Sequence, residues 1–247
     1  GRAYGNDAWG FGTFPGQYGM ALFVREGLTV LRDSIRTFRD LRWHEMPTAA
    51  VPVDSTTVEP WYSPNAWAEF RLSSKSHWDV PVQLPNGAVL HVLASHPTPP
   101  GFDGVARRNN HRNHDEIQLW VDYLSGAPYI EDDSGRAGGL HADASFVVMG
   151  DLNADPDDPS SFRSAIRALV GHERVNGAVV PTAGRQNGDS DLDPEDTSRW
   201  AARIDYVLPS ANLTVQEARV WRPRPAQVPN VPVSDHFPVW IDVRTGP

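Results

Sequence analysis

The chain has 247 residues, of which 40% are hydrophobic and nine are tryptophan, so it can build a sizeable core and is not globally disordered. It contains no cysteine, which excludes disulfides, thiolate metal sites and a cysteine nucleophile. A net charge of −9 argues against a protein that coats nucleic-acid duplexes, because such proteins need basic surfaces. An acidic chain can still act on phosphates when a bound divalent cation reverses the local field.

The first half of the chain indicates short strands and a turn. The motif Pro85-Asn86-Gly87 predicts a hairpin between two of these strands. Neither a repeat nor a low-complexity linker interrupts the sequence, so we expect one domain over residues 1–247. The strands are predicted at 18–25, within 28–38, and at 66–74, 78–84 and 88–96.

Helices and strands alternate in the second half. A helix is predicted from Asn113, a capping residue, to Gly126, and a second helix after Ser160 or Ser161. The segment 145–150 is almost continuously apolar, as in a strand whose sheet is covered on both faces. Further strands are predicted at 203–210, 213–221 and 237–243, and the alternation indicates a layered α/β fold.

A concentration of carboxylates follows the apolar strand SFVVMG. Asp151 and Asn153 are two positions apart, so in an extended chain they point to the same side. Such a pair can provide a carboxylate for a metal or a water, and an amide for a phosphate oxygen. A helix-entry loop rich in turn-forming residues is the alternative interpretation, and it suits the aspartates at 155, 157 and 158 better.

Three further polar positions lie at or inside apolar strands. His96 ends the strand VLASH, and Asp205 lies within RIDYVL, where an unpaired carboxylate is unfavourable. The dipeptide Asp235-His236 comes just before the strand FPVW. A buried aspartate beside an imidazole fixes its tautomer, so we predict that Asp205 pairs with His236. Taken one at a time, each of these residues also fits a structural role.

Together, the ordered segments SHPTPP, VVMGDLNADP, RIDYVL and SDHFPVW resemble the endonuclease/exonuclease/phosphatase superfamily, which includes pancreatic-type deoxyribonuclease, abasic-site endonucleases and bacterial sphingomyelinases. The resemblance runs from about Gly10 to Val243. It implies a DNase I-like, four-layer α/β/β/α sandwich, in which helices flank two packed, mostly antiparallel sheets. It also implies a divalent-metal-dependent phosphoester hydrolase that uses in-line attack of water.

The resemblance assigns catalytic roles by position. His96 and His236 would hydrogen-bond the scissile phosphate, and Asp205 would pair with His236. Asp151 would orient or deprotonate the attacking water, while Asn153 would hold the phosphate and position Asp151.

The implied cofactor is Mg²⁺, with Mn²⁺ or Ca²⁺ as alternatives. Asp235 would be a metal ligand, with Asp151 and Asn153 completing the set. His111 and His114 have a spacing that suits a metal pair on a helix, but no third ligand accompanies them, so no metal site is predicted there.

Candidate substrate contacts precede the strand that leads to His96. Lys75 and His77 in SSKSHWDV, and Arg112 in ARRNNHRNH, are predicted to contact a phosphate. A sheet-edge loop and a solvated loop are the structural alternatives. The expected substrate is a phosphate ester of nucleic acid, of a phospholipid head group or of a small molecule, and the expected oligomeric state is a monomer.

The family pattern begins with a strand that carries an asparagine, followed by a Gln-Glu motif whose glutamate is the main metal ligand. The residues before FPGQYGM contain neither, and Gln216-Glu217 comes too late in the chain, so it reads as an edge-strand pair. We therefore expect an N-terminal part beyond this chain, which could stay bound as a separate fragment. Export to the periplasm or the medium is also expected. The alternative function is a non-catalytic binding domain that has lost its metal site.

Overall fold

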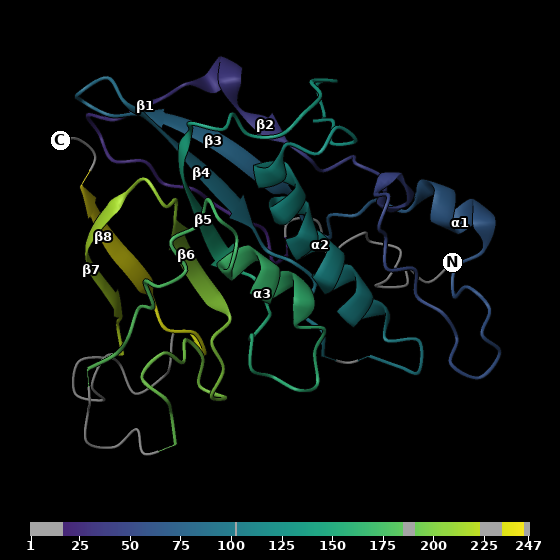
Figure 1. Ribbon diagram of the computed structural model, residues 1–247. Coiled ribbons are helices and arrows are strands. Elements are labelled where there is room, and N and C mark those ends of the chain that lie inside the picture. The colour runs from purple at the N-terminus through teal and green to yellow at the C-terminus, as the bar shows by residue number, and fades with distance from the viewer. Residues whose placement is uncertain (1–16, 102, 185–190, 223–233, 245–247) are drawn as a thin grey trace.

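The computed structural model describes residues 17–101, 103–184, 191–222 and 234–244. Its centre is a six-stranded sheet with strand order β1-β3-β4-β5-β6, in which β2 also pairs with β3 (Figure 1). All neighbouring strands are antiparallel except β4 and β5, which are parallel. The strands are β1 (Thr29–Val30), β2 (Arg36–Thr37), β3 (His77–Gln83), β4 (Val89–Ser95), β5 (Ser145–Asp151) and β6 (Asp205–Pro209).

Helices α2 (Arg108–Ser125) and α3 (Ser164–Val170) lie against one face of this sheet (Figure 1). Trp120 of α2 and Ile166 of α3 belong to the same buried cluster as Phe146 and Val148 of β5. This cluster is the main core. The remaining helical segments are α1 (Pro64–Glu69) and two short 3₁₀ turns, η2 (Arg32–Ser34) and η3 (Trp43–Glu45).

The other face of the main sheet meets a second, two-stranded sheet formed by β7 (Thr214–Val220) and β8 (Val239–Arg244). Val147 and Val207 of the main sheet pack against Ile241 and Val243 of β8. Alternate residues of β5 therefore face the helices and the second sheet, as its almost unbroken apolar sequence predicts. The two-sheet α/β sandwich is confirmed, and three of its four expected layers are seen. Within the described ranges, no helix covers the outer face of β7 and β8.

Two predicted strands are wrong. Residues 18–25 have no regular secondary structure, and part of 66–74 forms the helix α1 instead. The helix begins there because the Ser63 side chain accepts the Ala66 N–H (3.2 Å) and Pro64 occupies the first helical position. These two N-terminal signals outweigh the alternating pattern that favours a strand.

The predicted helix starts are also displaced. Helix α2 begins at Arg108 rather than Asn113, because the Asp103 carboxylate accepts the N–H groups of both Asn109 (2.7 Å) and Asn110 (2.8 Å). Its predicted end is confirmed, since Gly126 has a φ of 76°. Ser160 and Ser161 do not cap α3, because their hydroxyl groups donate to Asp158.

The described helices include none that is both long and apolar enough to cross a bilayer. The single domain, the additional N-terminal part, the monomeric state and the exported location stay predictions.

The central strand offers a direct test of the core. Val148 is fully buried on the helix-facing side of β5, so Val148→Ala should lower the free energy of unfolding by about 2 kcal/mol, measured by urea denaturation. The matched control is Val105→Ala, whose side chain is 61% exposed and should change the free energy by less than about 0.5 kcal/mol. Equal effects of the two substitutions would contradict this placement of the core.

Candidate active site

The predicted site residues meet at one edge of the main sheet. His96 follows β4, Asp151 ends β5 and Asp205 begins β6. Because β4 and β5 are parallel while β5 and β6 are antiparallel, these three positions come together. Asp151 and Asp205 are register partners, so both carboxylates project from the sheet face that carries the second sheet.

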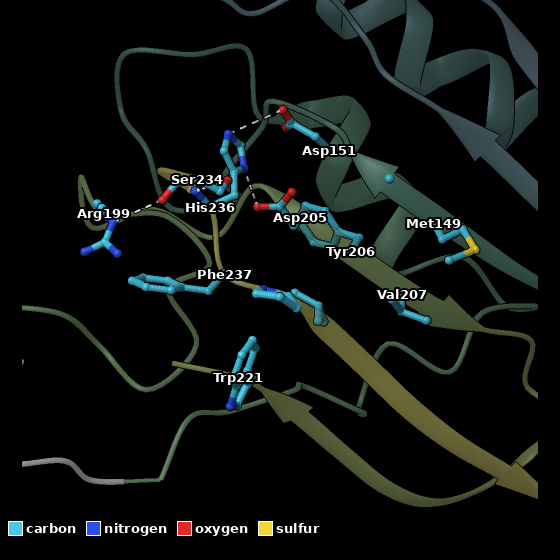
Figure 2. Close-up of a pocket in the computed structure, with 13 residues that line it drawn as sticks. Met149, Asp151, Arg199, Asp205, Tyr206, Val207, Trp221, Ser234, His236 and Phe237 are labelled. Carbon is cyan, nitrogen blue, oxygen red and sulfur yellow. Dashed lines mark hydrogen bonds and ion pairs between the residues drawn. The ribbon is translucent and has the colours of Figure 1, made fainter. Parts of the chain in front are cut away.

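His236 lies between these two carboxylates (Figure 2). Its Nδ1 is 2.8 Å from Asp205 Oδ2, and its Nε2 is 3.9 Å from Asp151 Oδ2. A carboxylate can only accept, so Nδ1 of His236 carries the proton that is donated to Asp205. The Ser234 hydroxyl accepts the backbone N–H of His236 (3.0 Å) and holds the residue in place. The predicted Asp205–His236 pair is therefore present.

His96 and Asn153 flank Asp151 as predicted. His96 Nε2 is 3.4 Å from Asp151 Oδ2. The backbone N–H of Asn153 donates to Asp151 Oδ1 (2.9 Å), and its side-chain amide lies 3.3 Å from Asp151 Oδ2. Asn153 has a φ of 50°, a left-handed conformation that asparagine tolerates better than most residues. The turn after β5 thus folds the amide back onto the carboxylate.

Burial and neighbouring charge separate the pKa values of the three ionisable groups. Burial, assisted by the charge of Asp205, raises the pKa of Asp151 to about 6. The hydrogen bond to Asp205 raises the pKa of His236 to about 8. Burial, together with the charge of Lys75, lowers the pKa of His96 to about 4. At neutral pH the site therefore combines an anionic aspartate, a cationic histidine and a neutral histidine.

Lys75 is also brought to the site. Its ammonium group donates to the carbonyl of Pro97 (3.2 Å), which also accepts from the side-chain amide of Asn153 (3.2 Å). Burial lowers the pKa of Lys75. The strands approach closely here, because a Cβ on Gly150 would lie 2.1 Å from the carbonyl oxygen of Ser95. Only glycine allows this approach, which brings the His96 and Asp151 ends together.

The structure differs from the predicted substrate contacts of His77 and Arg112. Both are buried, and the ring of His77 contacts the Glu116 carbonyl (2.8 Å) and the Ser73 hydroxyl (2.6 Å). The Arg112 guanidinium donates to the carbonyls of Leu72 (2.9 Å) and Arg71 (3.0 Å). These enclosed contacts are structural. Because α2 starts earlier than predicted, Arg112 lies inside the helix and faces the core.

A different set of groups could hold a cation. Ligand atoms of Asp151, Asp205 and His236 all lie within 4.8 Å of one another. The charge of Asp205 raises the pKa of Asp151, and a bound cation would relieve this repulsion, so the donor set fits a hard divalent ion. Asp235, predicted as a ligand, is exposed and is not a member of this group. Asn153 instead lies beside it, hydrogen-bonded to Asp151.

Two polar residues of α2 that the sequence analysis did not assign to the site hold its parts together. Glu116 is fully buried and accepts the backbone N–H groups of Ser74 (2.5 Å) and Thr98 (2.6 Å). The Asn113 amide donates to the carbonyls of Thr98 (2.8 Å) and Leu152 (2.9 Å). We call Arg112, Asn113 and Glu116 the α2 clamp. These polar residues lie next to the apolar positions 117 and 120 of the same helix. That spacing was the sequence signal that could have predicted their inward orientation.

The α2 clamp ties three separate segments to one helix. Ser74 precedes Lys75, Thr98 follows His96, and Leu152 lies between Asp151 and Asn153.

The fold and the site together define a class of protein. It is a two-sheet α/β protein that holds carboxylates, histidines and an amide at one edge of its main sheet. In sequence, residues 1–236 match the model of the Endonuclease/Exonuclease/phosphatase family. The chain belongs to that family.

Solved structures resemble the fold at low identity. An endonuclease/exonuclease/phosphatase protein from Beutenbergia cavernae is 21% identical, with a TM-score of 0.42; the alignment covers 69% of this chain and 39% of that one. The human nocturnin catalytic domain is 15% identical (TM-score 0.46; 90% and 62% covered). A mannosyl-6-phosphatase from Bacteroides thetaiotaomicron is 14% identical (TM-score 0.45; 90% and 69% covered). The chain thus spans well under two thirds of the first structure's length. A search of curated proteins gives no match.

The α2 clamp can be tested without an activity assay. Glu116→Gln places an amide NH₂ against a backbone N–H, so it should lower the free energy of unfolding by about 1–3 kcal/mol. Hydrogen exchange at the Ser74 and Thr98 amides, which lie in the loops bound by Glu116, should quicken more than exchange within α2. Glu131→Gln, at an exposed position, is the control and should leave both amides protected. Unchanged exchange in Glu116→Gln would refute the α2 clamp.

Proposed function

We propose that this protein is a divalent-metal-dependent phosphoester hydrolase that activates water for in-line attack on phosphorus. Membership of the family supports a hydrolase of this kind. The observation that carries the proposal is the placement of Asp151 between a neutral histidine, His96, and a cationic one, His236, whose ring is fixed by Asp205. A binding module has no need of such a set.

The roles follow from the protonation states. Asp151, as an anion, accepts a proton from the attacking water. His236, as a cation, donates Nε2–H to a phosphate oxygen, while Asp205 holds its ring and supports its charge. His96 and the Asn153 amide donate to the same phosphate group, and Lys75 adds positive charge nearby. His236, His96, Asn153 and Lys75 thus stabilise charge that develops on the phosphate in the transition state.

Magnesium is the proposed cofactor, with Mn²⁺ or Ca²⁺ as substitutes. Asp151 and Asp205 would hold it, and Asp235 and Asn153 stay proposed ligands. When bound, the ion supplies charge neutralisation on the phosphate and lowers the pKa of nearby water. The chain's own contribution is to set two carboxylates side by side across β5 and β6.

The proposed substrate is a phosphate ester of one of three classes: a nucleic acid, a phospholipid head group or a small molecule. Assays of the intact protein with magnesium against plasmid DNA, sphingomyelin and a chromogenic phosphodiester would separate these classes. Turnover of one substrate that stops on chelation supports the proposal. No turnover of any of them, together with retained binding, would favour the non-catalytic alternative.

His236 gives the sharpest activity test. His236→Ala should lower kcat by about 100-fold or more, because it removes a positioned proton donor. The fold should be retained, since the ring is partly exposed at the site edge. His141→Ala is the matched control: its side chain is 81% exposed, and it should keep full activity. Unchanged turnover in His236→Ala would show that the catalytic assignment is wrong.

The pH profile should be bell-shaped. Asp151 is active when deprotonated, so activity should rise as the pH passes its pKa of about 6. A bound cation would shift this rise to a lower pH. His236 is active when protonated, so activity should fall as the pH passes its pKa of about 8. Asp205→Asn removes the charged acceptor, so the alkaline limb should move to lower pH by about one unit. Asp242→Asn, at an exposed position on β8, is the control and should leave the profile unchanged. An unshifted alkaline limb in Asp205→Asn would contradict the role of the pair.

A further inference from the structure

A surface hollow lies on the helix side of the main sheet, away from the carboxylate cluster. Its volume is about 590 Å³, and it opens between α2 and the start of α3. None of the described residues that line it belongs to the proposed active site. Its polar lining comes from His111 and His114 of α2, and from Ser161, Arg163, Ser164 and Arg167 at the start of α3.

Three side chains beside this hollow form a continuous hydrogen-bonded chain. His114 Nε2 is 2.9 Å from the Ser164 hydroxyl, and His114 Nδ1 is 2.8 Å from Asp115 Oδ1. Asp115 is fully buried, His114 is 20% exposed, and Ser164 is exposed. The order from solvent inward is therefore hydroxyl, imidazole, carboxylate. A serine nucleophile, its general base and the group that orients the base follow the same order.

The proton positions follow from the other contacts of Asp115. Its Oδ2 accepts the indole N–H of Trp43 (2.6 Å) and the backbone N–H of Ala50 (2.6 Å), which fixes the carboxylate in the core. Its Oδ1 is left to accept from His114, so the imidazole carries its proton on Nδ1. The lone pair of Nε2 then faces the Ser164 O–H. That tautomer is the one a general base requires.

A structural role alone does not explain this arrangement. A hydrogen bond to an exposed hydroxyl contributes little to stability, because water replaces it readily. The buried end of the chain is held by Trp43 and Ala50 whether or not Ser164 is present. The outer half, by contrast, orients a basic nitrogen toward a solvent-accessible oxygen in a hollow of ligand size.

We propose that Ser164 is a nucleophile activated by His114, and that this hollow is a second, metal-independent site for small carboxylic esters that carry an anionic group. Arg163 and Arg167 line the hollow. Arg163 donates to the Asp157 carbonyl (3.2 Å) and Arg167 pairs with the Asp157 carboxylate (3.3 Å), so the two arginines leave a net positive charge there that suits the anionic group and a developing oxyanion. The activity is separate from phosphoester hydrolysis.

The reaction balances with water as the only co-substrate. Ser164 Oγ forms a bond to the ester carbonyl carbon while its proton moves to Nε2 of His114. The bond from that carbon to the alcohol oxygen then breaks, and His114 returns the proton to the leaving alcohol. Water attacks the acyl-serine in the same way, releasing the carboxylic acid and restoring Ser164. Asp115 stays ionised throughout and acts as a positioning residue.

A fluorophosphonate probe on the full chain tests this directly, because it forms an adduct only with an activated serine. With EDTA present, intact-mass analysis and peptide mapping should find one adduct, on Ser164. Ser164→Ala should abolish labelling, and His114→Ala should slow it by about 100-fold. Ser161→Ala lines the same hollow without contacting His114, so it should label at the normal rate.

Further controls separate this site from the metal-dependent one. His236→Ala should label like the unmodified chain, since it lies on the other sheet face. His114→Gln keeps a partner for Ser164 and guards against a folding defect; with native circular dichroism it should also label slowly. No adduct, an adduct on another serine, or labelling of Ser164 at the same rate in His114→Gln would each overturn the proposal.

Discussion

The active-site edge depends on a buried carboxylate that accepts two backbone N–H groups from different loops. Glu116 is fully enclosed, so an ionised side chain there is tolerated only because Ser74, Thr98 and the nearby cations Arg112 and Lys75 satisfy it. Burial raises its pKa, but the charges of Arg112 and Lys75, with further contributions from His77 and the Ser74 N–H, together outweigh that effect and lower the pKa. One helical residue therefore joins the loop before β3 to the loop after β4, and the hydrogen bond from Lys75 to the Pro97 carbonyl adds a second link between them. Asn113 adds the third segment through the carbonyl of Leu152.

The electrostatics of the site follow from strand register. Asp151 and Asp205 oppose each other across β5 and β6, so each raises the cost of charge on its neighbour. His236 offsets this repulsion by holding a proton between them, which is why its pKa is raised while that of buried His96 is lowered. Two residues of the same type, His236 and His96, therefore carry different charges at neutral pH because their surroundings differ. The site has an acid and a base at neutral pH.

Much of this site was predictable, and the failures have physical causes. Asp205 within an apolar strand required a partner, and the pairing with His236 follows from that requirement. Asp151, Asn153 and His96 were predictable because strand ends at one sheet edge must meet. Arg112 lies inward because the start of α2 is set by Asp103, a residue outside the helix. His77 begins β3, and its ring is enclosed by Ser73 and the Glu116 carbonyl, contacts that the local sequence does not reveal. The role of Glu116 could not be predicted, because it depends on where the loops of Ser74 and Thr98 lie in space, and no local sequence pattern gives those positions.

The most direct test of an assembled site is the titration of its histidines in the intact protein, followed by NMR of the ring C–H signals. With the site assembled, two histidines should depart from the ordinary value in opposite directions: the pKa of His236 should be about 8 and that of His96 about 4. Substitution of either residue identifies its signal. If both rings titrated near the ordinary value of about 6.5, the carboxylates and loops would not be gathered as described.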